Sequence, residues 1–375
     1  MRIGIVIGRI GGVDGVALET EKWIAVLRGL GHEIRVLTGE LEAPRSDTTV
    51  LPELSFAHPA TIREQEDAFF AQQADEGELL DRLERAAAAV ERDVGRWMSL
   101  NGIELLITQN STTLPCHLVM GMALKRLIER TGIPTIAHDH DFHWERGDRY
   151  RSRYAGIQAI IAECFPPDLP NLTHVVINSH CRDSLDVERG IPARVIPNVM
   201  DFEQEFVRSD DFNRDLPAEL GLDDGDIHLF QVTRIVRRKG IETAIELVER
   251  LDDPRIKLVI TGTATDDYNG EYLAELRAQA SGLNRPGQVI FAGDRFANVR
   301  VSANGSAPVF SLADAYAHAH ACTYFSRYEG FGNAFVEALV ARVPIFVNNY
   351  QPVYWPDIGS KGFRTVQIEE NELTD

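Results

Sequence analysis

The chain has 375 residues, of which 44% are hydrophobic and 25% are charged, and its formal net charge at pH 7 is −19. This length suits two domains, and the composition is that of an ordinary globular protein. The large excess of negative charge argues against nucleic-acid binding and against docking on an anionic membrane by bulk electrostatics, so neither partner is expected.

The cysteines and the start of the chain indicate the cellular compartment in which the protein is expected. The cysteines lie far apart and form no Cys-x-x-Cys pair, which favours reduced thiols over a disulfide framework or a zinc site. The chain runs from Met1-Arg2 directly into a short strand-like segment, which is neither a signal peptide nor a membrane span. We therefore expect a cytoplasmic protein. The four cysteines are Cys116, Cys164, Cys181 and Cys322.

The first elements predict a β-α-β unit, which begins a Rossmann-like domain. A short apolar strand over 3–7 is followed by a glycine-rich loop over 8–15, a helix over about 16–30 and a strand over 33–38. The loop matches the dinucleotide motif GxGxxG only loosely. The acidic residue expected at the end of the second strand is displaced to Glu40, which weakens the dinucleotide interpretation without excluding it.

The next strand ends in polar residues. Residues 41–75 contain three prolines and are predicted to be irregular, and 73–100 is predicted to be a helix rich in Ala, Glu and Arg. A strand over 104–110 follows, and its carboxyl end lies at the sheet edge where α/β folds bind ligands. Asn110 and Ser111 are therefore binding-site candidates, and the alternative is that they are plain loop residues.

A stretch dense in histidine and aspartate, 138–146, comes after a predicted helix over 116–130 and a strand over 133–137. One interpretation is a metal site. However, side chains of an extended chain alternate, so the first histidines and the aspartates face opposite sides, and no second ligand cluster completes a site. Because the stretch follows a sheet strand, it opens at the ligand-binding edge. The binding candidates in it are His138, Asp139 and Asp141.

Four arginines, at positions 146, 149, 151 and 153, follow in a chain that is otherwise strongly acidic. A solvated surface explains them about as well as a local anion site does. Arginine binds carboxylate or phosphate through a bidentate fork, so the sharper hypothesis is an anionic ligand such as a sugar phosphate or a glycerate. Arg146 and Arg149 are the better candidates.

A basic loop opens the second half of the chain. An acidic, irregular linker over 202–225 leads to a strand over 226–233 and, after the loop, to a helix over 241–251. Basic side chains between a strand and a helix can neutralise a diphosphate, and the alternative is a solvated loop. Arg234 and Lys239 are the candidates. Arg237 and Arg238, between them, are expected to face solvent.

The remaining elements continue the alternation of strands and helices. Strands are also predicted over 173–179, 255–262, 288–293, 321–325 and 343–348, and helices over 181–189, 271–281 and from 312.

The turn Gly330-Phe331-Gly332 is predicted to lie between the strand over 321–325 and a helix over 335–341. Unpaired backbone N–H groups and the helix dipole make such a turn an anion site, and glycine lets a ligand approach closely. Glu329 and Glu337 face roughly the same side, because eight positions are about two helical turns. Carboxylates accept hydrogen bonds from sugar hydroxyls, so a nucleotide sugar suits both features. The alternative is a surface helix with two solvated glutamates.

The pattern Glu329-x7-Glu337, with its Gly-Phe-Gly turn, resembles the signature of retaining GT-B glycosyltransferases of the large family 4. The resemblance implies that Glu329 holds hydroxyls of the donor hexose and that Glu337 holds the ribose of the nucleotide. It also implies that Arg234 and Lys239, which have the family's spacing, neutralise the donor diphosphate in place of a metal.

The resemblance implies further roles. Gly11 and Gly12 would approach the donor phosphates, His138 would contact the donor sugar near the reacting carbon, and the backbone at Gly293 would read the base. The catalytic set is then His138, Arg234, Lys239 and Glu329. The donor-binding set is Gly11, Gly12, Gly293, Gly330, Phe331, Gly332, Asn333 and Glu337. The acceptor-binding candidates are Asn110, Ser111, Asp139, Asp141, Arg146 and Arg149, and no metal ligand is expected.

The fold that the resemblance implies is α/β, of the GT-B type, with two Rossmann-like domains whose parallel sheets face across a cleft. The acceptor-binding domain would span residues 1–200 and the nucleotide-sugar-binding domain residues 201–375. Relatives continue beyond the point where this chain stops, so the second domain is expected to be incomplete.

The expected activity is transfer of glucose or mannose, with retention and without metal or cofactor, from a UDP-, GDP- or ADP-hexose to a small-molecule or sugar acceptor. A soluble, anionic acceptor is favoured, because no basic membrane-facing surface is evident. The departing phosphate would act as the base, so no protein nucleophile is expected. The alternatives are a non-catalytic sugar-nucleotide-binding protein, and a phosphorylase or epimerase that uses the same fold.

Overall fold

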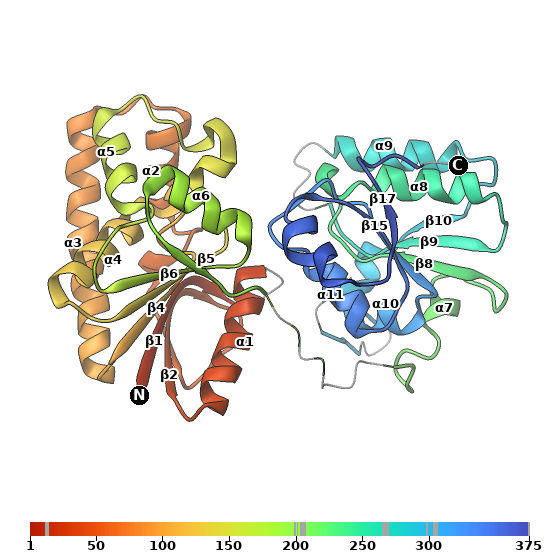
Figure 1. Ribbon diagram of the computed structural model, residues 1–375, viewed down its shortest axis with the longest axis horizontal. Coiled ribbons are helices and arrows are strands. Elements are labelled where there is room, and N and C mark those ends of the chain that lie inside the picture. The colour runs from red at the N-terminus through yellow and green to blue at the C-terminus, as the bar shows by residue number, and fades with distance from the viewer. Residues whose placement is uncertain are drawn as a thin grey trace. The chain divides into compact units, whose positions relative to one another are not determined.

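The computed structural model describes residues 1–11, 15–198, 200, 202, 208–264, 270–297, 299–302 and 307–373. The chain divides into two compact units, Met1–Pro197 and Asn198–Asp375. Each unit is an α/β layer structure in which helices pack against a parallel sheet (Figure 1).

The sheet of the first unit has seven strands, all parallel, in the order β3-β2-β1-β4-β5-β6-β7. From β1 the chain moves outward through β2 and β3, and it then returns to the other side of β1 for β4. This reversal makes the carboxyl ends of β1 and β4 a topological switch point, where open α/β sheets bind ligands. The strands are β1 (Arg2–Ile10), β2 (Glu33–Leu41), β3 (Thr48–Val50), β4 (Leu105–Gln109), β5 (Thr135–Asp139), β6 (Leu172–Val176) and β7 (Ala193–Val195).

Helices cover both faces of this sheet, which is why β1 is buried along almost its whole length. Ile3, Ile5 and Ile7 form a cluster with Ile24 of the first helix, whereas Val6 belongs to the core on the other face. The helices are α1 (Gly15–Gly29), α2 (Pro59–Gln65), α3 (Glu76–Asn101), α4 (Leu118–Thr131), α5 (Ala155–Cys164) and α6 (Ser179–Arg189), with short 3₁₀ segments at Pro52–Leu54, Pro115–His117 and His143–Tyr150 and a π turn at Glu66–Phe70.

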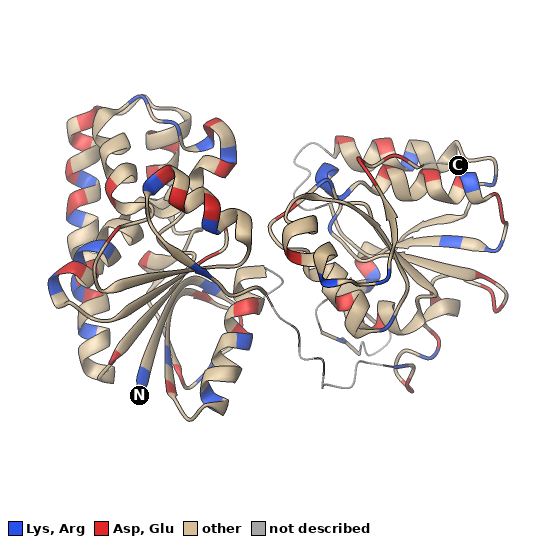
Figure 2. Cartoon of the chain, viewed as in Figure 1, with Lys and Arg blue, Asp and Glu red and all other residues tan. Residues whose placement is uncertain are grey.

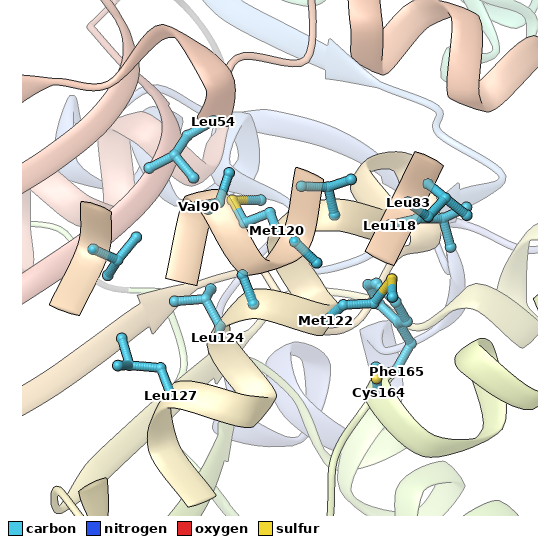
Figure 3. Close-up of a cluster of buried hydrophobic side chains, with 14 of the residues drawn as sticks. Leu54, Leu83, Val90, Leu118, Met120, Met122, Leu124, Leu127, Cys164 and Phe165 are labelled. Carbon is cyan, nitrogen blue, oxygen red and sulfur yellow. The ribbon is translucent and has the colours of Figure 1, made fainter. Parts of the chain in front are cut away.

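The larger core of the first unit lies against α3 and α4. Leu83 and Val90 of α3 belong to the same buried cluster as Leu118, Leu124 and Leu127 of α4 (Figure 3). The buried positions of α3, which are Leu79, Leu83, Ala87, Val90, Val94, Trp97 and Met98, recur mostly at intervals of three or four, so the helix has one apolar stripe. This packing fixes the helices that flank the ends of β1 and β4.

The second unit repeats the plan with a six-stranded parallel sheet in the order β10-β9-β8-β13-β15-β17. Its strands are β8 (Ile227–Gln231), β9 (Ile256–Ile260), β10 (Val289–Phe291), β13 (Ala321–Tyr324), β15 (Ile345–Asn348) and β17 (Val366–Ile368), with two smaller pairs, β11 (Phe296–Ala297) with β12 (Phe310–Ser311) and β14 (Tyr328–Glu329) with β16 (Gln351–Pro352). Its helices are α7 (Leu216–Glu219), α8 (Ile241–Leu251), α9 (Glu271–Ser281), α10 (Leu312–His318) and α11 (Asn333–Val340). Short 3₁₀ turns lie at Arg237–Lys239, Gly293–Arg295 and Gly359–Lys361, and a π turn lies at Tyr354–Ile358.

Two pairs of helices sandwich the second sheet. Ile245 and Val248 of α8 and Leu276 of α9 pack with Leu258 of β9 in one core. α10 and α11 lie on the opposite side of the strands (Figure 1) and contact β8, β13 and β15. α11 thereby starts at the carboxyl edge of β13.

The sequence predicted most of these elements, and the helices over 241–251 and 271–281 are confirmed with the same bounds. The prediction that 41–75 is irregular was wrong, because this segment contains β3, α2 and the π turn. Two of its three prolines, Pro52 and Pro59, begin elements instead of breaking them. Pro59 is at the first turn of α2, where the missing N–H costs nothing, and His58 caps that turn by accepting from the Ala60 N–H at 3.3 Å.

Helix α5 was not predicted. It is short and strongly apolar, and Ile157, Ile161 and Cys164 are buried at helical spacing. A run of this kind does not distinguish helix from strand by periodicity alone.

No helix among the described residues is long and apolar enough to cross a bilayer. α3, with its 26 residues, shows why length alone does not decide this, because acidic and basic side chains alternate along it (Figure 2).

Candidate functional site

The Gly330–Gly332 turn connects β14 to α11. Gly332 has φ +110°, and a Cβ at this position would lie 2.3 Å from the Tyr350 hydroxyl. That hydroxyl donates to the Phe331 carbonyl at 3.0 Å, which holds the turn in place. No side chain caps the N-terminus of α11, so the helix end presents backbone N–H groups. Gly330, Phe331, Gly332 and Asn333 are thus arranged as an anion-binding turn requires.

Glu329 lies just before this turn and is buried, with 6% of its surface exposed. Its Oε1 accepts from Lys239 Nζ, and its Oε2 accepts from Arg238 Nη1 at 2.7 Å. Burial alone would raise the pKa of the Glu329 carboxyl, but the charges of Lys239 and Arg238 outweigh that effect and lower the pKa to about 2. The carboxylate is therefore ionised at neutral pH and acts as an acceptor.

Lys239 is buried beside this carboxylate, with its Nζ 5.2 Å from the centre of the Tyr324 ring. Burial lowers the pKa of Lys239, and the charges of Arg238 and Arg234 act in the same direction. Glu329 opposes them. Arg234 is exposed at the end of β8, close enough for its charge to affect Lys239. The two cations predicted from the sequence therefore lie in one group.

Arg238 was expected to face solvent, and its side chain is 40% exposed, but it also takes part in the charged group. Besides its contact with Glu329, it donates to the Tyr328 carbonyl at 3.0 Å. The residues Arg237–Lys239 form one 3₁₀ turn, so successive side chains point in different directions. Arg237 does point outwards and pairs with Glu275 through two contacts of 2.7 Å. Adjacency to Lys239 was the only sequence signal for Arg238.

Glu337 lies on α11, where Oε2 accepts from the Tyr316 hydroxyl at 2.9 Å. Tyr316 is buried on α10 and also meets the Ala334 carbonyl at 3.3 Å, so it ties α10 to the start of α11. Asn333 Oδ1 accepts from Asn198 Nδ2 at 3.1 Å. No sequence pattern pointed to Tyr316, because a tyrosine on the apolar face of a helix is most simply explained by packing.

Gly293 lies where three strand ends come together. A Cβ on Gly293 would be 2.3 Å from the Gly262 carbonyl oxygen, and one on Gly262 would be 1.9 Å from the Thr233 carbonyl oxygen. The backbones that follow β8, β9 and β10 are therefore in direct contact.

In the first unit, Asn110 joins the ends of β4 and β5. It adopts a left-handed conformation with φ 50°, and its Oδ1 accepts from the His140 N–H at 3.0 Å and from Thr113 Oγ1 at 2.7 Å. Its Nδ2 donates to Asp141 Oδ1 at 3.0 Å. Asn110 and Asp141 are thus brought together, as a shared binding edge requires.

His138 is completely buried at the end of β5. It stacks on Trp23 of α1 with ring centroids 4.3 Å apart, and Nδ1 lies 2.8 Å from Gln109 Oε1. Burial and the neighbouring His140 keep the pKa of His138 well below its usual value, so the ring is neutral. Because an amide oxygen can only accept, Nδ1 carries the proton and Nε2 is an acceptor. Trp23 covers the ring, so a sugar contact requires movement of this indole.

Asp139 and Ser111 are turned into the protein. Asp139 Oδ2 lies 2.7 Å from His174 Nδ1, and His174 Nε2 lies 3.0 Å from the Pro167 carbonyl. Both ring nitrogens of His174 face acceptors, so both would carry a proton. Burial lowers the pKa of His174, but the charge and hydrogen bond of Asp139 outweigh burial and raise it. Ser111 Oγ donates to the carbonyls of Val6 and Gln109 at 3.3 and 3.0 Å. Neither residue is brought to a surface that a substrate reaches.

A cavity of about 410 Å³ opens at the ends of β1 and β4, the switch point of the first sheet. Gly8 lies on its wall, and a Cβ there would be 2.3 Å from the Phe56 ring, so glycine is what lets Phe56 pack against β1. Asn110 and Arg149 line the cavity, whereas Arg146 does not and instead pairs with Asp141. Gly11, next to this edge, has φ +94°, and Gly12 lies outside the described residues.

The histidine–aspartate stretch has protein partners of its own. In the part of the chain that the structure describes, no group of three or more His, Cys, Asp or Glu side chains is arranged to hold a metal ion.

Comparison with known proteins identifies the family. The family model "Glycosyl transferases group 1" matches residues 212–354. The chain is 31% identical over 388 residues to mannosylglucosylglycerate synthase of Petrotoga mobilis, a match that covers 98% of this chain and 86% of that protein. The chain belongs to the group 1 glycosyltransferase family. Mannosylglucosylglycerate synthase of Thermotoga maritima is 32% identical over 378 residues, with coverage of 98% and 85%.

The fold of this glycosyltransferase is also similar to that of solved structures. WaaG, a glycosyltransferase involved in lipopolysaccharide biosynthesis, matches with a TM-score of 0.59 at 13% identity, over 98% of this chain and 86% of that chain. The predicted GT-B architecture, with two Rossmann-like parts, is confirmed. The family resemblance seen in the Glu329–Glu337 stretch is confirmed as well.

Each unit of the glycosyltransferase gathers part of the predicted set. In the second unit, Glu329, Lys239 and Arg234 form one charged group beside the Gly330–Gly332 turn. In the first, Asn110 and Arg149 line one cavity, while Asp139 and Ser111 bond inside the protein. The roles assigned to these residues stay predictions.

Proposed function

We propose that this glycosyltransferase moves a hexose from a nucleoside-diphosphate sugar to an acceptor that carries a glycerate group. The two curated relatives that span almost the whole chain are mannosylglucosylglycerate synthases, which makes mannose the first candidate sugar and glucosylglycerate the first candidate acceptor. The observation that carries the proposal is the buried Glu329 carboxylate, held by Lys239 and Arg238 beside an uncapped helix end.

The charged group suits both ends of a sugar diphosphate. Ionised Glu329 is an acceptor for hexose hydroxyls. Lys239 has three N–H donors, so it can bond Glu329 and a phosphate oxygen together, and Arg234 adds a second cation nearby. The first backbone N–H groups of α11 supply further donors and the positive end of the helix dipole.

Departure of the diphosphate is the step that these residues assist. Negative charge develops on the leaving phosphate as the bond to the hexose breaks, and fixed donors stabilise that charge. We propose that this replaces a metal ion and that a departing phosphate oxygen takes the proton of the attacking hydroxyl. Attack from the leaving-group face then retains the anomeric configuration. Turnover in excess EDTA is the expected result.

A glycerate acceptor agrees with the charge pattern of the first unit. A carboxylate needs a cation, and Arg149 brings one to the cavity at the ends of β1 and β4. The family match establishes the transfer of glycosyl groups; the acceptor class rests on the relatives' names and on this arginine.

Ligand-induced thermal shift tests the donor half of the proposal. The protein is melted alone and with UDP, GDP, ADP and their glucose and mannose conjugates. We expect Tm to rise with the conjugates of one base only, because binding to the native state stabilises it. The Lys239→Ala variant should lose that rise. No shift in the wild-type protein with any nucleotide would contradict the proposal.

A further inference from the structure

The cavity of the first unit is lined by both apolar and polar residues. Apolar side chains come from β1, from the Phe56 loop and from the α2 region, and they include Ile7, Phe56, Ile62 and Phe70. The polar lining residues are Gln109 at the end of β4, Asn110 after it, and Arg9, Gln65, Glu66 and Arg149. A volume of about 410 Å³ lies within the usual range for small-molecule sites. The combination suits a small molecule with an anionic end.

Two cations line this cavity, Arg9 and Arg149, and the contacts of Arg149 leave its charge available. Its guanidinium carbon lies 5.9 Å from the centre of the Phe70 ring and 5.6 Å from that of Tyr150, and it meets the Tyr150 hydroxyl. Among the described residues it forms no ion pair with a carboxylate, although Glu66 also lines the cavity. Aromatic faces hold the guanidinium without neutralising it, so its fork stays open to a carboxylate.

The neighbouring arginines are engaged elsewhere. Arg146 pairs with Asp141, which Asn110 also holds, and it does not line the cavity. Arg151 is exposed, and its Nη1 lies 3.7 Å from Asp148 Oδ1. Arg153 lies over the Tyr154 ring and donates to the Tyr154 hydroxyl at 3.2 Å. The structure therefore distinguishes Arg149 from Arg146, which the sequence ranked together.

Gln109 provides a second point of recognition. Its side chain is buried, with 2% of its surface exposed, and it lines the cavity. Oε1 is taken by His138 Nδ1 at 2.8 Å, while Nε2 has no hydrogen-bond partner among the described residues. A buried amide N–H without a partner is costly, and an acceptor oxygen of a ligand would satisfy it.

We propose that this cavity is the subsite for the carboxylate end of the acceptor, with Arg149 binding the carboxylate through its fork and Gln109 Nε2 donating to a hydroxyl oxygen. This inference rests on the proposed function for its choice of ligand. It goes further in naming the residue that selects acids over neutral sugars. Phe70, stacked under the guanidinium, positions Arg149 at the cavity wall.

Titration calorimetry with two probes tests the subsite directly. Glucosylglycerate and its carboxamide differ only at the carboxylate, which the amide replaces with a neutral group of similar shape, so their affinity ratio reports the carboxylate contact. We expect wild-type protein to bind the acid about 10- to 100-fold more tightly than the amide, as for charge-assisted bidentate hydrogen bonds. Arg149→Ala should bring the ratio close to one. Arg149→Lys keeps the charge but not the bidentate guanidinium, so its affinity ratio should lie between those of the wild type and Arg149→Ala.

Arg151→Ala is the matched control, because it removes the same charge from the same segment outside the cavity. It should leave the affinity ratio at the wild-type value. A wild-type ratio near one, or an unchanged ratio in Arg149→Ala, would overturn the subsite. Melting curves of each variant verify folding, and Arg149 is exposed, so its loss should not affect the core.

Turnover measurements separate this inference from the proposed function. If the wild-type enzyme transfers hexose to glucosylglycerate and Arg149→Ala has an unchanged acceptor KM, the subsite is wrong and the function stands. If the affinity ratios follow the expectation but no donor yields transfer, the subsite stands and the proposed function fails.

Discussion

Glu329 is held by two cations, buried Lys239 and partly exposed Arg238, so the three side chains together keep a net positive charge. A diphosphate would compensate that charge. The same geometry keeps Glu329 ionised for a sugar hydroxyl. In the proposed function, one ion-pair group therefore serves both parts of the donor.

Replacement of Lys239 tests this group. Lys239→Ala should lower kcat/KM by at least about 10²-fold, because it removes a fixed donor from the developing charge of the leaving group. Steady-state kinetics with saturating acceptor measures the effect. Arg237→Ala, which removes the neighbouring cation that pairs with Glu275 at the surface, is the control and should retain near-wild-type kinetics. If Lys239→Ala and Arg237→Ala have equal values of kcat/KM, Lys239 has no role in the mechanism.

The low pKa of Glu329 predicts a pH dependence of stability. The folded-state pKa is about 2, against an ordinary value of 4.5, so the stabilisation is present above about 4.5 and is lost as the pH falls towards 2. Glu329→Gln should therefore unfold in urea with a shallower dependence on pH over that window. Glu249→Gln, at an exposed position of α8, should keep the wild-type slope. If Glu329→Gln keeps it too, the ion-pair group is not formed.

The sequence could predict the residues of this site whose type and spacing carry the chemistry. Glu329, Lys239 and the glycine turn form such a pattern, and the structure places them together. Arg238 and Tyr316 could not be predicted, because their contacts depend on the direction of a 3₁₀ turn and on the packing of α10 against α11. His138 was predicted by position, but its cover, Trp23, comes from a distant helix.

At the scale of elements, the turn before α11 depends on Gly332. Its φ of +110° suits glycine alone, and Tyr350 fills the space that a side chain would need. The orientation of the first N–H groups of α11 follows from this turn. An element boundary thus determines the binding geometry.

Gly332→Ala should strain this turn and move Tyr350. We expect a loss of about 1–3 kcal/mol in the free energy of unfolding, together with a raised KM for the nucleotide sugar. Urea unfolding and donor kinetics measure the two effects. Gly225→Ala, where a Cβ meets nothing within 4 Å, is the control. A Gly332→Ala protein with wild-type stability and KM would show that the turn tolerates a side chain.

Elements with clear periodicity and flanking signals could be predicted from the sequence. α8 and α9 begin after glycines, and their predicted bounds hold. α2 and the π turn could not be predicted, because prolines there start elements and the helical run is only a few residues long. The part of the cavity wall that α2 and the π turn form could not be predicted from the sequence for the same reason.

At the scale of the whole molecule, two units with parallel sheets each present a ligand-binding edge. The first places its cavity at the switch point between β1 and β4, and the second places the charged group after β8 and β13. The alternation of strands and helices predicted both sheets, and the Glu329–Glu337 pattern pointed to the glycosyltransferase family that the full-length relatives establish. The acceptor could not be read from a pattern, because the cavity is assembled from segments far apart in the chain.

The transfer reaction itself tests the central claim most directly. The protein is incubated with GDP-, UDP- or ADP-mannose, or the glucose conjugates, and with glucosylglycerate, and the products are followed by NMR. We predict that one donor yields a new glycosidic bond with the donor's anomeric configuration, together with one nucleoside diphosphate per bond formed. Hydrolysis of the donor without transfer, or a product of inverted configuration, would contradict the account.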